Sequence, residues 1–402
     1  MNPKEKVGVG HADVTGLEKR YVNDCLDNSR LSQGDYVARF ESGFAKAHGK
    51  KFGIMCSSGT AALHLALECL KETDGWKPGD EILVPAITFI ATPNSCIHAG
   101  LKPVFVDVDP KSYNIDPGKI EKRITKKTKA IIPVHCFGLP CEMDEIVSIA
   151  KENNLRIIED CAESHFARYK KEPVGSFGDF SCFSTYVAHT ITTGVGGLVL
   201  TDEVKHAEVV RSLLAHGRAC SCIKCVASDP TKVCPIRFDE GADKRFTFLR
   251  IGYSYRVGEI EGALGLAQFE RRGEIMRKRR ENAYYLNKVL ADLSDSLQLP
   301  MHPDYVEPSF MMYPIVVKDG VDRGELIAHL EKNNIETRPM LPVLSQPAYR
   351  GLFGDMEDEY PVAKRINQNG FYIGCHHGLD RGILDYVSKI IHDFFEDGPN
   401  KG

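Results

Sequence analysis

The chain has 402 residues, of which 43% are hydrophobic and 26% are charged, and its formal net charge is -4. Such a length allows a large α/β domain and a smaller second domain, each with its own core. The small net charge argues against nucleic acid or an anionic membrane as a partner. No run of about 18 apolar residues suits a membrane span, and residues 1–16 lack the apolar core of a signal peptide. We therefore expect a cytoplasmic enzyme.

Helical and strand patterns alternate along most of the chain. Amphipathic helices are predicted at 12–30 and 32–49, with Asp13 or Thr15 as the N-cap of the first. The strand KFGIMC leads directly into a helix that begins in SSGTAALHL. Further short apolar strands are predicted in VPAITF, GLKPVFVDVDP, KAIIP, NLRIIED, FSCFSTY and GLVLTD, most of them separated by helical segments. This alternation predicts a doubly wound, mostly parallel α/β sheet.

The last third of the chain predicts a second, smaller α/β domain. From about residue 285 it contains the strand FMMYPIVVK, the helix RGELIAHLEKNN and the loop ETRPMLPVLSQPAYR. We therefore place a large domain at 1–284, with a cysteine-rich insert at 218–240, and a small C-terminal domain at 285–402.

Polar residues that could carry chemistry follow the predicted strands. Asp160 closes the strand RIIED, and the stretch 179–197, DFSCFSTYVAHTITTGVGG, passes through His189 into a Gly-rich loop. Strand ends of this kind are where α/β folds place ligands. The backbone N–H groups around SSGT, at the start of a helix, form a natural phosphate cradle, although these residues could simply cap the helix.

These motifs together resemble the DegT/DnrJ/EryC1/StrS family of sugar aminotransferases, which are pyridoxal-phosphate enzymes of fold type I. Its motif F-S-F-x-x-x-K-x-x-T-x-G-E-G-G resembles the stretch around His189, and its phosphate loop resembles the stretch around SSGT. The resemblance covers roughly residues 10–395. It implies that the cofactor is bound by Ser58, Gly59, Thr60, Phe89, Asp160, Ser184 and Ser254.

The resemblance also implies a role for each of these residues. Asp160 would pair with the pyridinium nitrogen and make the ring a better electron sink, and Phe89 would stack on the ring, although core packing is the commoner fate of such a Phe. Ser184 would hold the phosphate. Ser254 stands where the family has an Asn that reaches the phosphate of the partner subunit, which implies a homodimer. Glu163, near the phenolic oxygen, is typical of the 3-dehydrase branch.

The main departure from the family motif is His189, which stands where the family has the Lys that binds the cofactor covalently. Imidazole cannot form that bond, so pyridoxamine phosphate would be held non-covalently. A His can still act as a general base near neutral pH. Two branches of the family share this replacement, and both act as C3 dehydratases of nucleotide-linked 4-keto-6-deoxysugars. A degenerate pseudoenzyme or an engineered Lys→His variant are the alternatives.

Four of the thirteen cysteines form one motif, C-x-C-x2-C-x8-C, made by Cys220, Cys222, Cys225 and Cys234. Four thiolates in a polar, Pro-containing loop have no packing role, and they can close on an iron–sulfur cluster (2Fe–2S or 4Fe–4S) or on zinc. The flanking residues resemble the iron–sulfur 3-dehydrases. Those enzymes take one ligand from the position of Ala162, so Cys161, its neighbour, is an alternative to Cys225. Most of the other cysteines are predicted to be small buried hydrophobes.

We therefore predict a homodimeric C3 dehydratase of a nucleotide-linked 4-keto-6-deoxysugar that uses pyridoxamine or pyridoxal phosphate. His189 is the predicted base, Glu163 is the second catalytic residue, and an iron–sulfur cluster accepts electrons from a reductase. One alternative is a non-reductive dehydratase or an aminotransferase-like enzyme with a structural zinc loop. Another is a non-catalytic cofactor-binding homologue.

Overall fold

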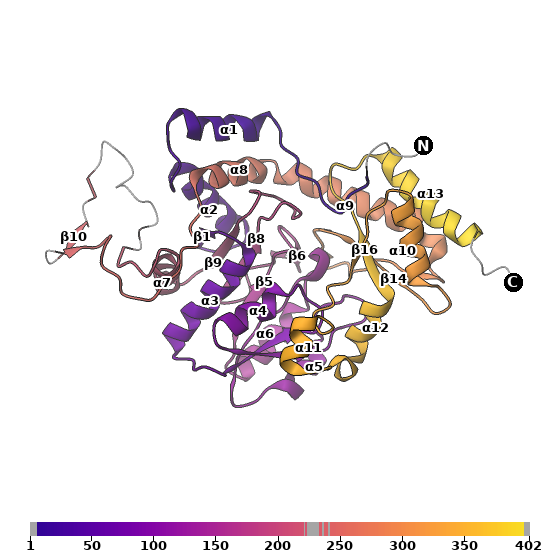
Figure 1. The fold of residues 1–402 in the computed structure, drawn as a ribbon, viewed down its shortest axis with the longest axis horizontal. Helices are drawn as coiled ribbons and strands as arrows, with labels where there is room; N and C mark the ends of the chain where they lie inside the picture. The colour runs from indigo at the N-terminus through magenta and orange to yellow at the C-terminus, as the bar shows by residue number, and fades with distance from the viewer. Residues whose placement is uncertain (1–5, 221, 223–232, 235–236, 240–241, 398–402) are drawn as a thin grey trace.

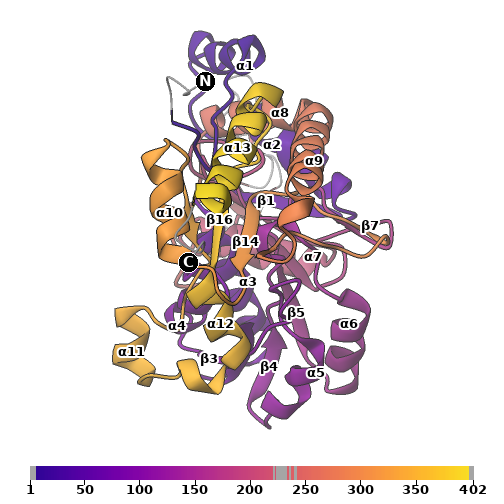
Figure 2. The ribbon, with the colours of Figure 1, turned by 90° about the vertical axis from the view of Figure 1, so that its right-hand side faces the viewer.

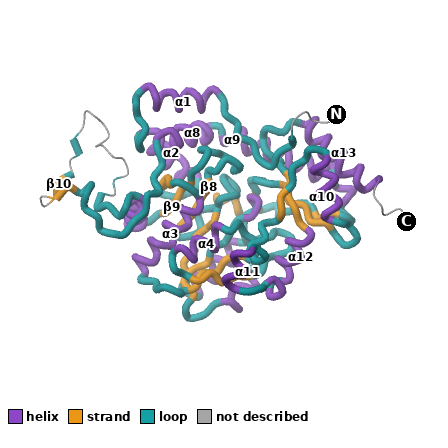
Figure 3. Tube along the Cα trace, viewed as in Figure 1, coloured by secondary structure: helices purple, strands orange, loops and turns teal. Residues whose placement is uncertain are grey.

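A computed structural model describes residues 6–220, 222, 233–234, 237–239 and 242–397. A seven-stranded sheet with the strand order β1-β9-β8-β5-β4-β2-β3 forms its centre (Figures 1 and 3). The strands are β1 (Phe52–Cys56), β2 (Glu81–Pro85), β3 (Lys102–Val106), β4 (Thr128–Ile131), β5 (Arg156–Asp160), β8 (Phe180–Ser184) and β9 (Gly197–Thr201). Only β9 runs antiparallel to both of its neighbours, β1 and β8. The predicted mostly parallel sheet is therefore confirmed.

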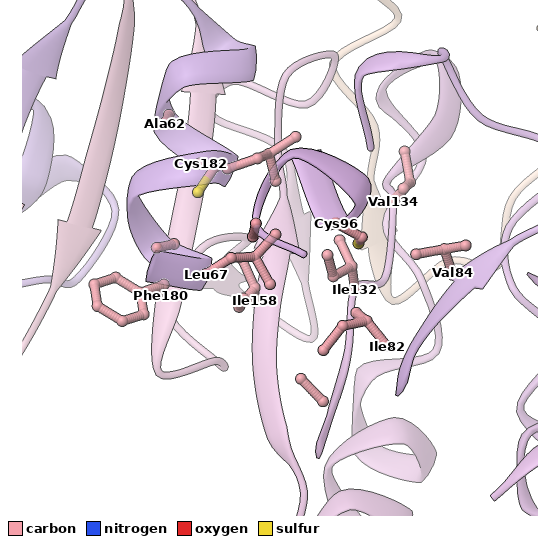
Figure 4. Packing of buried hydrophobic residues seen from close by; sticks show 14 of the residues in the cluster. Ala62, Leu67, Ile82, Val84, Cys96, Ile132, Val134, Ile158, Phe180 and Cys182 are labelled. Atoms are coloured by element: carbon pink, nitrogen blue, oxygen red, sulfur yellow. The ribbon is translucent and has the colours of Figure 1, made fainter. Parts of the chain in front are cut away.

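Helices cover both faces of this sheet because alternate strand residues point to opposite cores. In β2, Ile82 and Val84 belong to one buried cluster, whereas Leu83 belongs to another. Figure 4 shows the first cluster, in which residues of the strands meet Ala62, Leu67 and Cys96 from the helices. The helices of the large domain are α1 (Gly16–Asp27), α2 (Asp35–Ala47), α3 (Gly59–Asp74), α4 (Ala91–His98), α5 (Pro117–Ile120), α6 (Met143–Glu152), α7 (Val204–Leu214), α8 (Glu259–Glu270) and α9 (Arg272–Val289).

Local sequence signals set several of these boundaries. Thr15 caps α1 in a capping box with Glu18, so of the two predicted caps the structure selects Thr15. Gly49, with φ of 70°, follows the end of α2, as predicted for a Gly in the left-handed region. The predicted strand VPAITF was placed too late, because β2 ends at Pro85 and Ala86 and Ile87 are buried outside it. The residues that follow Pro85 in this apolar run are thus buried, although they lie outside the strand.

A second, antiparallel sheet lies in the C-terminal part of the chain (Figure 2). Its order is β12-β14-β16-β15, built from β12 (Leu297–Gln298), β14 (Tyr313–Val317), β16 (Gly370–Ile373) and β15 (Arg338–Pro339). The neighbouring helices are α10 (Arg323–Lys332), α11 (Pro347–Phe353), α12 (Pro361–Asn369) and α13 (Arg381–Asp397). In a small three-stranded sheet, β6 (Arg168–Tyr169) lies between β13 (Val306–Glu307) and β7 (Glu172–Pro173). The division of the chain at residue 284 stays a prediction.

The described residues at the start of the cysteine-rich insert follow the end of α7 (Figure 1). Its two stems are paired, because the Ala219 N–H donates to the Thr247 carbonyl at 2.8 Å and Arg218 forms a bridge with Phe248. Within it, β10 (Phe238–Asp239) pairs with β11 (Ala242–Asp243). Among the described residues, no helix has the length and apolar character that crossing a membrane requires.

The start of α3 packs so closely on the sheet that Gly197 tolerates no side chain. A Cβ at this position would lie 2.5 Å from the carbonyl carbon and oxygen of Ser58. We expect Gly197→Ala to lower the free energy of unfolding by about 1–3 kcal/mol, as overpacking does, and to weaken anion binding at this helix start. Denaturant unfolding measures the first effect. Gly273→Ala is the matched control, since its Cβ would meet nothing within 4 Å, and a similar loss in both variants would contradict the prediction.

Candidate active site

A cavity of about 670 Å³ opens where the parallel strands of the large sheet end. Its walls come from the start of α3, the loop after β2, the ends of β5 and β8, residues 9–12, and the segment from Glu336 to Leu341. Eight of the residues predicted for the site line this one cavity: Ser58, Gly59, Thr60, Phe89, Asp160, Glu163, Ser184 and His189. The carboxyl edge of the sheet thus gathers segments that lie more than 100 residues apart.

The start of α3 forms an anion cradle in the cavity wall. Ser58 is its N-cap, and its Oγ accepts a hydrogen bond from the Ala61 N–H at 3.0 Å. Gly59 is required here because a Cβ would lie 2.7 Å from the Cβ of Ser184, so that β8 approaches the helix backbone directly. The free N–H groups of the first turn and the positive end of the helix dipole favour a phosphate at this point.

Asp160 presents a buried carboxylate to the cavity and is only 5% exposed. Its Oδ2 accepts from the Thr92 hydroxyl at 2.8 Å and its Oδ1 from the Ala162 N–H at 3.1 Å. Burial raises the pKa of Asp160, although these two hydrogen bonds act against the rise. Within the described part of the chain it forms no ion pair, so a cationic ring nitrogen in the cavity would supply the missing counter-charge.

Phe89 is an aromatic side chain on the cavity wall that is 60% exposed. An exposed large hydrophobic residue at the mouth of a cavity has apolar area left for a ligand to cover. A flat heteroaromatic ring would bury this area by stacking. The alternative that Phe89 packs in the core is therefore wrong.

Glu163 lies between the cavity and the loop after β4. Its Oε2 accepts from the Phe137 N–H at 2.5 Å, and Phe137 has a positive φ of 57°. Burial raises the pKa of Glu163 to about 7, and the charge of Asp160 adds to the rise while the Phe137 hydrogen bond opposes it. A carboxyl group with such a pKa can give up or accept a proton at neutral pH.

His189 stands at the cavity with a defined tautomer. Its Nδ1 lies 2.5 Å from the carbonyl oxygen of Ala162, which can only accept, so Nδ1 carries the proton and Nε2 keeps its lone pair. The ring stacks on His165, with 6.2 Å between the centroids. Burial lowers the pKa of His189 to about 4, so the imidazole is neutral at pH 7 and able to accept a proton at Nε2.

Ser254 is the one predicted cofactor ligand outside the cavity lining. It is exposed and forms an isolated bridge with Ala215. The neighbouring Tyr255 carbonyl accepts from the Ser57 N–H at 2.8 Å, so this segment runs along the outside of the anion cradle. Within the described chain Ser254 does not reach the cavity, and its cross-subunit role stays a prediction.

The predicted metal ligands are only partly described. Cys220 and Cys222 are partly exposed, with their Sγ atoms 3.7 Å apart, and Cys234 is also partly exposed. Cys225 lies outside the described residues. A separation of 3.7 Å is far longer than the roughly 2.05 Å of a disulfide. It matches the ~3.8 Å expected for two thiolates at ~2.3 Å from one tetrahedral metal ion.

Cys161, the alternative ligand, is fully buried beside His135 and Glu159. These three residues could in principle hold a metal ion. However, the side chains of His135 and Glu159 are already engaged in hydrogen bonds. The His135 Nδ1 accepts from the Cys141 N–H at 3.0 Å, which leaves Nε2–H to face Glu159 at 3.3 Å. We therefore interpret this group as a structural one and retain the insert cysteines as the predicted ligands.

Several cavity residues were not found by sequence reasoning. Thr92 supports Asp160, and the Thr88 hydroxyl lies 2.8 Å from that of Thr92. Thr88 lies in the loop before α4, which begins at Ala91, so no helical periodicity marks the pair. His11, Glu336 and Tyr372 reach the cavity from distant parts of the chain, and no local pattern marks them.

The residues present fit pyridoxal or pyridoxamine phosphate. The cradle of α3 suits its phosphate, the unpaired buried carboxylate of Asp160 suits its ring nitrogen, and the exposed Phe89 suits its ring face. The described lining of the cavity contains no Lys that could bind the cofactor covalently. At the position where the family has that Lys, this chain has His189.

The comparisons with known proteins agree with this geometry. The model of the DegT/DnrJ/EryC1/StrS aminotransferase family matches residues 13–392. The chain belongs to this family. It is 34% identical over 393 residues to a GDP-perosamine synthase of Escherichia coli O157:H7, covering 97% of this chain and 99% of that protein. It is 33% identical over 380 residues to a dTDP-4-dehydro-2,6-dideoxy-D-glucose 3-dehydratase of Saccharopolyspora spinosa, covering 91% and 81% of the two chains.

Among solved structures, the fold matches that of E. coli GDP-4-keto-6-deoxy-D-mannose-3-dehydratase with bound hydrated PLP. The TM-score is 0.85 at 29% identity, with 96% of this chain and 99% of that chain covered. Fold type I and a pyridoxal-phosphate-type cofactor are thereby shown for this chain, as is membership of a family of sugar aminotransferases and 3-dehydratases. Within the family, the two relatives named above carry out different reactions.

The raised pKa of Glu163 makes stability depend on pH. Between pH 4.5, its usual pKa, and about pH 7, Glu163 keeps its proton in the folded state but releases it in the unfolded chain. The contribution of Glu163 to the stability of the folded state is therefore fully present below pH 4.5 and is lost as the pH rises through 7. We expect the unfolding free energy of the apoprotein, relative to that of Glu163→Gln, to fall across this window in denaturant titrations. A difference between the two proteins that stays constant from pH 4.5 to 8 would contradict the assignment.

Proposed function

We propose that this chain is a C3 dehydratase of a nucleotide-linked 4-keto-6-deoxysugar that works with pyridoxamine phosphate. The observation that carries the proposal is His189, which faces the cavity where the family has its covalent Lys. Without an amine at this position, the enzyme cannot hold the cofactor covalently between cycles as an aminotransferase does. A base remains, and with it chemistry that needs only proton transfer.

When bound, the cofactor would supply an electron sink next to the sugar carbonyl. The residues of the chain would orient it and transfer the protons. Asp160 keeps the ring nitrogen protonated by offering a buried carboxylate, and Thr92 holds that carboxylate in place. Nε2 of His189 would be the atom that accepts a proton from the bound substrate, because Nδ1 is committed to Ala162. The electron pair left by that proton would replace the pair of the C3–O bond, and the same proton, returned by His189, would let the C3 hydroxyl leave as water.

We further propose that Cys220, Cys222, Cys225 and Cys234 bind an iron–sulfur cluster. Support comes from the 3.7 Å between the Sγ atoms of Cys220 and Cys222 and from the paired stems that hold the insert. A cluster would supply electrons that the dehydration alone does not provide, and its donor would be a reductase. Zinc fits the same separation and is the second candidate, and the enzyme would then be a dehydratase recycled by glutamate, with a structural metal loop.

A homodimer is part of this proposal. Ser254 is exposed beside the anion cradle, on the outer side of the segment that contacts Ser57. A second subunit placed there could add its own Ser254 to the phosphate site of the first.

Dehydration is tested by following the sugar product. With pyridoxamine phosphate and 4-keto-6-deoxyhexoses linked to GDP or dTDP, we expect mass spectrometry to show a product that has lost the C3 oxygen. His189→Gln should lower the rate by about 10²–10⁴-fold, the usual contribution of a general base, while cofactor affinity stays unchanged. Formation of a 4-amino sugar from glutamate at full rate in the wild type would contradict the proposal.

The cluster is tested by anaerobic reconstitution with iron and sulfide. We expect stoichiometric iron and sulfide, with a visible charge-transfer spectrum that dithionite bleaches, and we expect Cys222→Ser to lose both. Cys375→Ser is the matched control, because Cys375 is buried in the core. Bound zinc without such a spectrum, and turnover that depends on glutamate alone, would show that the cluster assignment is wrong.

A further inference from the structure

A segment at the start of the described chain, residues 6–13, crosses the cavity and is called the N-terminal strap here. One end is fixed to Glu336, whose N–H donates to the Val7 carbonyl at 2.9 Å and whose Oε2 accepts from the Val9 N–H at 3.0 Å. The other end is fixed at Asp13, which pairs with Arg271 and whose carbonyl accepts from Gln268 at 2.8 Å. Because both ends are anchored, the residues between them have a defined place on the cavity wall.

The strap passes next to the predicted base. A Cβ on Gly10 would lie 3.1 Å from the Cα of Ala188, the residue before His189. Gly10 is followed by His11, and both line the cavity. His11 therefore stands on the side of the cavity where the reacting part of a substrate must lie, close to the segment that carries His189.

The ring of His11, an exposed residue, packs against two other imidazole rings and a glycine. It stacks on His376, with 5.3 Å between centroids, and meets His377 edge to face at 6.1 Å. A Cβ on Gly378 would lie 2.7 Å from its Cδ2. Asp13 in turn lies 3.3 Å from Nε2 of His377. In the part of the chain that is described, neither ring nitrogen of His11 has a hydrogen bond.

The groups around His11 keep this wall largely uncharged. Burial and the nearby Arg279 lower the pKa of His376 to about 3 and that of His377 to about 4. Arg279 itself is fully buried, and its Nη1 donates to the Met311 carbonyl at 3.0 Å. The charged groups at the two ends of the strap are already paired, Lys6 with Glu336, which also pairs with Arg338, and Asp13 with Arg271. A neutral polar ligand group suits this environment.

We propose that the imidazole of His11 hydrogen-bonds a hydroxyl group of the sugar that enters this cavity. The inference rests on the proposed function in one respect, namely that the ligand is a nucleotide-linked sugar. An imidazole has a ring N–H that donates and a second ring nitrogen that accepts when it carries no proton, which matches a hydroxyl that both donates and accepts. The side chain is already ordered by His376 and Gly378, so little conformational entropy is lost when it binds.

Two substitutions separate this role from a packing role. His11→Phe keeps an aromatic ring on His376 but cannot form hydrogen bonds, whereas His11→Asn keeps hydrogen-bonding groups but cannot stack. Calorimetry on the cofactor-loaded protein would compare GDP-mannose and dTDP-glucose with GDP and dTDP. We expect His11→Phe to reduce the affinity gained from the sugar by about fivefold, since a hydrogen bond contributes about 1 kcal/mol. His11→Asn should stay within about threefold of the wild type, and both should bind GDP and dTDP normally.

The opposite pattern, with His11→Phe unchanged and His11→Asn weakened together with a lower melting temperature, would show that His11 only packs. If His11→Phe lost affinity equally for the sugar nucleotides and for GDP and dTDP, His11 would contact the nucleoside diphosphate rather than the sugar, and the assignment would be overturned. A wild-type protein that gains no affinity from the sugar would overturn it too. Because the assay measures binding, a protein that binds these sugars through His11 but dehydrates no keto sugar would refute the proposed function and leave the His11 contact standing.

Discussion

The carboxylate of Glu159, buried at the end of β5, is the interaction on which the geometry of the site depends. It accepts hydrogen bonds from the N–H groups of Gly175, Phe177 and Gly178 at 2.7–2.8 Å, and His135 lies 3.3 Å away. Burial opposes its ionisation, but the hydrogen bonds from His135 and the backbone outweigh burial and lower the pKa of Glu159. A charged carboxylate with this many donors ties the end of β5 to the turn before β8. Asp160, the next residue, is thereby aimed at the cavity.

Close backbone packing provides the second constraint. Gly59 and Gly197 let α3, β8 and β9 approach to distances that no side chain would allow. The start of α3 therefore reaches the carboxyl edge of the sheet beside Asp160. One elongated ligand could place a phosphate at the helix start and a cationic ring nitrogen at Asp160. The exposed Phe89 lies in the same wall of the cavity. The scaffold thus suits the family's cofactor, whichever residue performs the proton transfer.

What distinguishes this chain is the proton chemistry available next to that scaffold. His189 has one nitrogen occupied by the Ala162 carbonyl and a second that makes no hydrogen bond within the described residues, and Glu163 has a pKa of about 7. Neither group can replace the amine of a Lys, but Glu163 can give up or accept a proton at neutral pH, and the neutral imidazole of His189 can accept one at Nε2. The N-terminal strap adds an ordered His11 on the same side of the cavity. The reaction we propose follows from these residues rather than from the fold.

The sequence alone determined the elements whose signals are local. Alternating apolar strands and helices predicted the parallel sheet, and SSGT after a short strand predicted the anion cradle, because both depend on hydrogen bonding and burial within a few residues. Motif resemblance predicted Asp160 and His189. Only the tertiary structure decided that Thr92 supports Asp160, that Cys161 is buried with Glu159, and that the strap brings His11 to the cavity. These contacts join residues tens to hundreds of positions apart, and no local periodicity records which distant surfaces will meet when the core is packed.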